Sequence, residues 1–152
     1  MAGYPDSVRI REVGPRDGFQ NEPEVIATAD KVRLIEMLIA AGLKRIEVTS
    51  FVRPDVIPQL ADGAEVLAAL ERPDDVSFSV LIPNERGLDN ALAVRDRGCT
   101  DDGCDRPPGW CDVHHEIPWY LGGETNLENC KLKCRLHHRK VHEARGDGRA
   151  PP

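Results

Sequence analysis

Hydrophobic and polar positions in the first part of the chain follow two different repeats in turn. Stretches typical of strands, in which apolar and polar residues largely alternate, occur at 8–13, 45–49 and 76–82. After each of them, apolar residues recur roughly every three to four positions, as on one face of a helix, at 28–41, 61–70 and 87–95. Because strands and helices alternate, we predict an α/β fold with a parallel sheet of right-handed strand–helix–strand units.

The pattern changes after Gly98, where Gly, Pro, Cys and His become frequent and the hydrophobic repeat fades. A helix over 132–143 is the regular element that we predict there. The apolar residues are too few for an ordinary core, so we expect cross-links or bound metal to hold this part together. We therefore predict a first domain over 1–93, a second over 94–145 and a disordered tail over 146–152.

Composition and terminal sequence argue against two classes of protein, membrane-spanning proteins and exported proteins. The chain of 152 residues is 40% hydrophobic and 30% charged, as in ordinary globular proteins. No apolar run approaches the roughly 18 residues of a membrane span, and the N-terminus lacks the pattern of a signal peptide. We therefore expect a cytoplasmic protein with no membrane partner, and the sequence indicates no particular protein partner.

Charge is distributed unevenly along the chain. Residues 1–93 carry 10 Lys or Arg and 16 Asp or Glu, a net charge of −6, whereas residues 94–152 carry 10 of each kind. Within the second part, residues 131–149 include seven basic and two acidic side chains. Such a basic stretch is suited to the phosphates of a nucleic acid, and the alternative is a solvated helix face.

All five Cys and all five His lie beyond residue 98, which favours metal binding over disulfides in a chain without an export signal. Cys99 and Cys104 have four residues between them, and Cys134 and His137 have two. Two such short pairs, each on one tight turn, suit a tetrahedral structural Zn²⁺ site. The alternative is a set of free thiols. The other two Cys are interpreted as small core residues.

A second metal group is predicted from the remaining His. His138 and His142 are four positions apart and share one face of the predicted helix. With His114 they can bind one divalent ion and leave positions open for phosphate oxygens and water. His115 points to the opposite face of a strand, where it can act as general base on the attacking water. The ion is not specified, and Mg²⁺, Mn²⁺, Ni²⁺ and Zn²⁺ all fit. The alternative for each His is an ordinary surface or core residue.

The stretches 94–99, 103–115, 126–129 and 134–142 together resemble the HNH endonuclease family, in a branch that carries a structural zinc. The resemblance implies a hairpin-and-helix (ββα-metal) fold that holds the two metal groups above, with His115 as general base. It also implies a site role for Asn129, which would brace the hairpin loop. We therefore predict a metal-dependent endonuclease, a hydrolase that cuts the phosphodiester bonds of DNA. The alternative is a zinc-stapled nucleic-acid-binding module without catalysis.

The stretches 13–22, 46–52 and 56–62 resemble the hydroxymethylglutaryl-CoA lyases, a family of TIM-barrel carbon–carbon lyases. The resemblance implies that Asp17 is a metal ligand, that Arg16 stabilises the enolate and that Glu47 is an active-site acid. Such a barrel takes about 250 residues, and residues 1–93 hold three strand–helix units and no His. We therefore predict a truncated barrel fragment, fused to the second domain, whose three site residues are vestigial. A lyase is the remaining alternative function.

Overall fold

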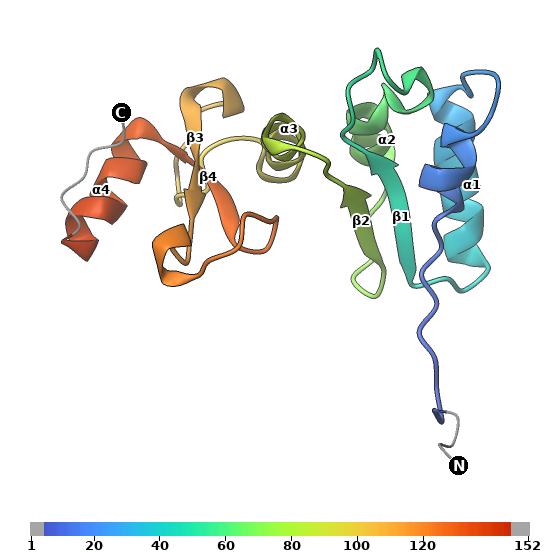
Figure 1. Cartoon of the computed structure of the whole chain (residues 1–152), viewed down its shortest axis with the longest axis horizontal. Helices are drawn as coiled ribbons and strands as arrows, with labels where there is room; N and C mark the ends of the chain where they lie inside the picture. Colours follow the sequence, from blue (N-terminus) through green and yellow to red (C-terminus); the bar gives the residue numbers. More distant parts are fainter. Residues whose placement is uncertain (1–4, 147–152) are drawn as a thin grey trace. The chain divides into compact units, whose positions relative to one another are not determined.

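The structure, a computed structural model, describes residues 5–146. Its chain divides into two compact units, Met1–Asn84 and Glu85–Pro152, and each is described by itself (Figure 1). Apart from Gly146, the tail predicted over 146–152 lies outside the described residues. None of the helices in the described part is both long and apolar enough to span a membrane.

The described part of the first unit is a mixed α/β structure, as predicted. It contains the helices α1 (Thr28–Ala40) and α2 (Gly63–Ala69) and the strands β1 (Arg45–Ser50) and β2 (Ser77–Leu81). The two strands are parallel neighbours. Their register places Ile46 opposite Phe78 and shifts between Glu47 and Thr49. Helix α2 packs against both α1 and β1, so the strand–helix–strand pattern of the sequence is confirmed over residues 28–81.

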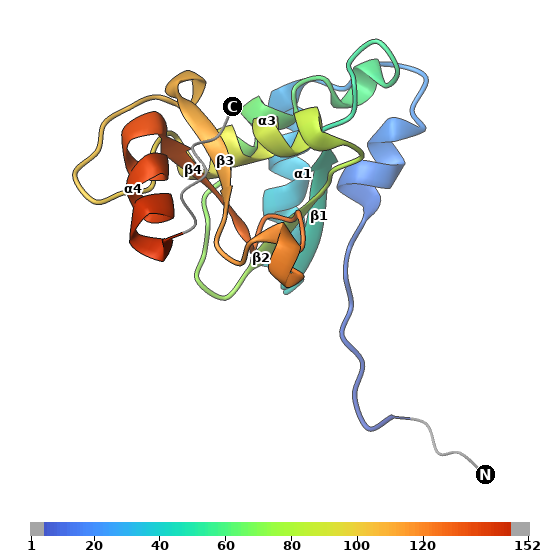
Figure 2. The ribbon, with the colours of Figure 1, turned by 60° about the vertical axis from the view of Figure 1, so that its left-hand side comes forward.

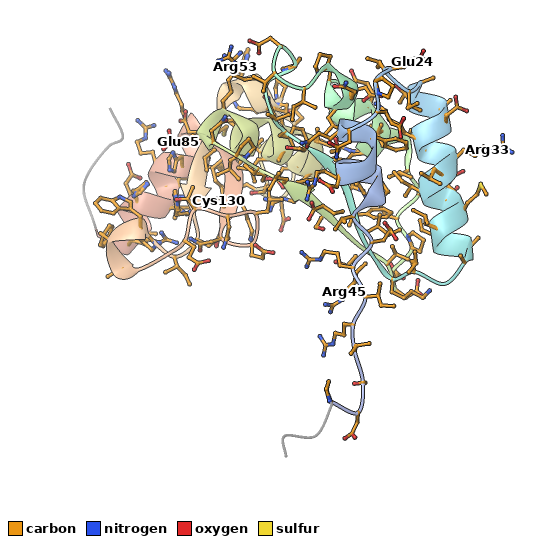
Figure 3. All side chains as sticks on the ribbon, turned by 45° about the vertical axis from the view of Figure 1, so that its right-hand side comes forward. Glu24, Arg33, Arg45, Arg53, Glu85 and Cys130 are labelled. Atoms are coloured by element: carbon orange, nitrogen blue, oxygen red, sulfur yellow. The ribbon has the colours of Figure 1, made fainter. Side chains whose placement is uncertain are left out.

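Apolar side chains from all these elements form the core of the first unit. Ile35 of α1 and Ile46 of β1 have no exposed surface, and Val48 and Val66 are buried as well. The alternation of buried and half-buried positions at the start of β1 follows from the two faces of a strand. Arg33, on the opposite side of α1, extends into solvent (Figure 3).

The strand predicted over 8–13 was wrong apart from one residue. Glu12 alone forms a parallel bridge to Ile46, with its amide donating to Arg45 O at 2.9 Å. Val8 and Ile10 are 77% and 65% exposed, so their side chains bury little apolar surface. An alternating sequence becomes a strand only when a neighbour completes its hydrogen bonds, and the described residues supply one only at Glu12.

The second unit contains a helix, an antiparallel hairpin and a final helix (Figure 2). Helix α3 (Glu85–Asp96) packs against β4 (Cys130–Cys134), which pairs with β3 (Cys111–His115). Helix α4 (Arg135–Arg145) packs against both strands. The helix predicted from residue 132 therefore begins later, because residues 132–134 are hydrogen-bonded to β3.

Two adjacent side chains at the end of α3 fasten it to the hairpin. Arg95 donates from Nη2 to Cys130 O at 2.7 Å and from Nη1 to Leu127 O. Asp96 accepts from the amide of Leu132 at 2.9 Å. Cys130, labelled in Figure 3, has no exposed surface, as expected for a small core residue. These bonds satisfy backbone groups of the loop and of β4 that no strand partner reaches.

Candidate functional site

Three of the predicted site residues meet in the first unit. Arg16 donates from Nε to Glu47 Oε1 at 2.6 Å and from Nη1 to Asp17 Oδ1 at 2.8 Å. Arg16 and Asp17 lie on a π-helical turn, Gly14–Gly18, which contacts β1. The side chains of Arg16 and Glu47 are 20% and 13% exposed. Because the pair is largely shielded from water, the guanidinium is held in one place.

The turn that carries Arg16 is itself fixed by backbone bonds. Glu12 accepts the amide of Gly14 on its Oε1 at 2.6 Å, and its backbone bridges to β1 on either side of Ile46. Asn21 donates from Nδ2 to Asp17 O at 2.7 Å. The single backbone bridge of Glu12 thus places the turn over β1, even though residues 8–11 form no strand.

The predicted metal role of Asp17 finds little support in its surroundings. Its side chain is 54% exposed. Within the described part of the first unit, no three Cys, His, Asp or Glu side chains gather at ligand distance. Ca²⁺ and transition-metal ions are typically held by several protein ligands. The residues present therefore do not make up a metal site, and no chemical step is assigned to an ion there.

A buried lysine network in the same unit was missed from the sequence. Lys31 is 2% exposed and donates to Asp62 Oδ1 and to Gln59 O, both at 2.6 Å. Thr28 donates to the other oxygen of Asp62 at 2.7 Å. Lysine is rarely buried unless it is paired, and its partners lie about thirty positions away along the chain, as their separations of 28 and 31 show. No local pattern could have found this network.

In the second unit, the four residues predicted to bind Zn²⁺ lie together. The ligand atoms of Cys99, Cys104, Cys134 and His137 are all within 4.8 Å of one another. His137 Nδ1 lies 3.4 Å from Cys99 Sγ and 3.4 Å from Cys134 Sγ. Zinc bonds of roughly 2.0–2.3 Å in a tetrahedron separate ligand atoms by about 3.5 Å. All five Cys are free thiols, so no disulfide competes for these atoms.

The thiols of this group differ in acidity. Burial raises the pKa of Cys99 to about 11. Burial also acts against ionisation of Cys134, yet backbone hydrogen bonds from His137 and Leu136 hold its pKa below the usual value. Cys134 immediately precedes α4, where amide groups without helical partners favour a thiolate.

His114, His138 and His142 form a second group. One ring nitrogen of each lies within 4.8 Å of the others. Their ring centroids are separated by 4.8–5.7 Å. His114 Nε2 and His138 Nδ1 are buried and have no hydrogen-bond partner among the described residues. Buried polar atoms without partners are costly, so these nitrogens are available for a cation.

The acidity of these imidazoles is consistent with that interpretation. Burial, helped by the neighbouring His138, lowers the pKa of His114 to about 4. Burial and the charge of His142 also lower the pKa of His138. Both rings are therefore neutral at pH 7, which is the form that binds a metal ion.

His115 and Asn129 lie apart from this group, on the loop side of the hairpin. His115 is half-buried, and its Nε2 lies 2.9 Å from Thr125 Oγ1. Asn129 accepts the amide of Ile117 at 2.8 Å and donates to Ile117 O and to Glu124 O at 2.9 and 2.8 Å. These bonds tie together the two ends of the loop between β3 and β4.

Comparison with known proteins supports the lyase resemblance. The chain is 53% identical over 89 residues to hydroxymethylglutaryl-CoA lyase YngG of Bacillus subtilis, covering 59% of this chain and 30% of that protein. It is 51% identical over 94 residues to the mitochondrial hydroxymethylglutaryl-CoA lyase of Macaca fascicularis, covering 62% of this chain and 29% of that protein. The chain thus spans about 30% of the length of these relatives.

Solved structures agree with these relatives. The crystal structure of the Bacillus subtilis lyase matches with a TM-score of 0.59 and 50% identity, covering 62% of this chain and 32% of that one. A lyase from Acinetobacter baumannii in complex with coenzyme A and 3-methylmalate matches with a TM-score of 0.58 and 40% identity, covering 64% and 32%. The N-terminal fragment of the chain is therefore lyase-like. No family model matches the chain.

These findings overturn the predicted enzyme class. The relatives and solved structures named above are hydroxymethylglutaryl-CoA lyases, and nothing supports an HNH endonuclease or another hydrolase. The prediction was wrong because spaced Cys and His indicate metal ligands but do not specify a reaction. It also set aside the lyase function of the first segment, which is the function that the relatives have. The expected cytoplasmic location remains a prediction.

Proposed function

We propose that the first unit provides part of an active site of hydroxymethylglutaryl-CoA-lyase type, which cleaves a carbon–carbon bond in a CoA thioester. The observation that carries this proposal is the 2.6 Å contact between Arg16 and Glu47, which joins a turn to β1 across 31 positions. The identity to the relatives above supports the same conclusion.

Arg16 has the central role in this proposal. Cleavage of the thioester substrate leaves an enolate, whose negative charge a fixed guanidinium stabilises. Glu47 accepts a hydrogen bond from Arg16 Nε and so sets the orientation of the guanidinium. The two carboxylates, Glu47 and Asp17, also leave the cluster with a net negative charge when no substrate is bound. Of the three side chains, the guanidinium of Arg16 is the one that attracts an anionic substrate.

The proposal is tested by mixing the whole chain with 3-hydroxy-3-methylglutaryl-CoA and divalent cations and measuring the acetoacetate released. Arg16→Gln should lower the rate at least tenfold, because one charged hydrogen-bond donor to a developing anion contributes roughly a hundredfold. Arg33→Gln, which removes an exposed arginine of α1, is the matched control and should leave the rate unchanged. Equal rates for wild type and Arg16→Gln would overturn the proposal.

We propose a second function for the second unit, that of a zinc-stapled module that binds DNA without cutting it. Two observations support it: the grouped ligand atoms of Cys99, Cys104, Cys134 and His137, and the seven basic side chains in residues 131–149. A bound Zn²⁺ would cross-link α4 and β4 to the loop before β3. The basic side chains would then contact phosphates.

Zinc content and DNA affinity test this second function together. The purified chain should contain about one Zn²⁺ at the Cys group, measured by mass spectrometry of the metal. Cys104→Ser should lose that ion, whereas Cys111→Ser, outside the group, should keep it. The affinity for a labelled duplex, measured by fluorescence anisotropy, should fall as salt rises. A chain that holds zinc but shows no binding at low salt would exclude the DNA part.

A further inference from the structure

A cavity of about 550 Å³ lies in the second unit, where the turn before β3 meets the first part of α4. Its volume is in the range of roughly 300–1,000 Å³ typical of small-molecule sites. The side chains that matter for its chemistry are Arg106, Trp110, Asp112, Arg135 and Arg139, which line it. The cavity lies outside both Cys/His groups.

Three arginines make the cavity positive. Arg139 has one carboxylate nearby, Glu143 on the same helix, at 3.7 Å. Neither Arg106 nor Arg135 forms an ion pair with a carboxylate in the part of the chain that the structure describes. The acidic lining residue, Asp112, has its Oδ2 3.8 Å from His138 Nδ1. The lining therefore has an excess of guanidinium groups, which suits a phosphate.

The cavity also has an aromatic wall. Trp110 is 64% exposed, which is unusual for a large apolar side chain. The guanidinium carbon of Arg106 lies 5.6 Å from the centre of its ring, a cation–π contact. Arg106 covers one face of the indole, and because Trp110 is largely exposed a planar base can stack on the other face. A phosphate without a base would make no stacking contact with the indole.

We propose that this cavity binds one phosphorylated nucleoside, with its base on Trp110 and its phosphate held by Arg135 and Arg139. Such a ligand joins a planar base to a phosphate. A free nucleotide or one nucleotide of a single strand supplies both groups. The inference rests on the proposed nucleic-acid function of the second unit and assigns it a binding site for one base.

Tryptophan fluorescence provides a direct test, because the chain has two Trp, at positions 110 and 119. The full-length Trp119→Phe protein emits from Trp110 alone and is titrated with adenosine monophosphate, with inorganic phosphate and with a single-stranded oligodeoxyadenylate. Stacking predicts quenching by the nucleotide, by the oligomer or by both, and none by phosphate at equal concentration. No quenching by either nucleotide ligand would overturn the proposal.

Two variants separate specific binding from general attraction to positive charge. Arg139→Gln should weaken the affinity for the nucleotide ligand roughly tenfold, the effect of one charged hydrogen bond. Arg86→Gln, an exposed arginine of α3 that lies neither in the cavity nor in the basic stretch 131–149, should change it little. Equal effects of the two would contradict the proposal. Trp110→Leu should weaken binding of a labelled oligomer roughly five- to hundredfold, with zinc content confirming that the variant is folded.

The DNA-binding function of the second unit and the base site in the cavity would be disproved by different results. If the chain binds duplex DNA but no ligand quenches Trp110, the cavity has no base site and the DNA function stands. If adenosine monophosphate quenches Trp110 but no DNA binds, the cavity holds free nucleotides and the DNA function is wrong. A greater affinity for the oligomer than for the mononucleotide identifies the strand as the source of the base.

Discussion

Single residues show best what the sequence could and could not predict. The spacing of Cys99, Cys104, Cys134 and His137 was sufficient to predict that they gather, because each short pair lies on one turn. Nothing in the sequence around Lys31 indicated that it is buried. Its environment depends on Asp62, which tertiary packing alone brings to it.

The buried lysine leads to a prediction about stability. Lys31→Met leaves Asp62 without its cationic partner, and removing one member of a buried ion pair costs about 3–5 kcal/mol of unfolding free energy. Urea denaturation measures the loss. Lys44→Met is the matched control, because the Lys44–Asp75 pair is exposed on both sides, and it should cost far less. Comparable losses in the two variants would show that the Lys31 network does not stabilise the fold.

The lowered pKa of His114 predicts how the folded protein responds to acid while its His group holds no metal. The pKa of His114 is near 6.5 in the unfolded chain. Burial and, after it, the charge of His138 lower this pKa to about 4 in the folded chain. The unfolded chain therefore binds more protons between these values, so the contribution to stability is present above pH 6.5 and is lost as pH falls toward 4. Thermal melts of protein that keeps Zn²⁺ at its Cys group, with no metal at its His group, should show a lower Tm at pH 5 than at pH 7.5. His114→Gln should reduce this dependence.

For whole helices and strands, the local sequence pattern predicted the correct element only where the segments that pack against it or pair with it are present. Residues 28–40 have a helical repeat and pack on α2, and α1 forms there. Residues 8–13 alternate as well as any strand, yet only Glu12 has a partner. The hairpin shortened the predicted helix over 132–143, because pairing with β3 competed with helix formation at Leu132. Pairing partners distant along the chain decided these boundaries.

The hairpin loop makes a prediction at the same scale. A Cβ at Gly123 would lie 1.8 Å from Ile117 O and 2.8 Å from Asn129 Nδ2. Gly123→Ala must therefore move the loop and break the hydrogen bonds of Asn129, at a cost of about 1–3 kcal/mol. A Cβ at Gly109 would meet nothing within 4 Å, so Gly109→Ala is the control and should change the unfolding free energy by less than about 0.5 kcal/mol. Equal stabilities would mean that the loop adapts freely.

For the whole molecule, the two units should respond differently to loss of metal. Both Trp residues belong to the second unit, so the near-ultraviolet circular dichroism of tryptophan reports on that unit alone. A chelator should abolish this signal, because small zinc-held domains fold only with their ion. The far-ultraviolet signal should persist in part, since Ile35, Ile46 and Val66 give the first unit a core of its own. A tryptophan signal that survived complete zinc removal would contradict the structural role of the ion.

The grouping of Cys99 with Cys134, 35 positions apart, has a consequence beyond the fold. A disulfide between such positions would remain in the unfolded chain, but an ion held by thiolates leaves when the chain unfolds. Mass action then makes the stability of the second unit depend on its surroundings, and each tenfold rise in free zinc above the dissociation constant adds about 1.4 kcal/mol. The folded fraction of the second unit therefore rises and falls with the concentration of available zinc. The amount of any binding surface to which α4 contributes changes in the same way.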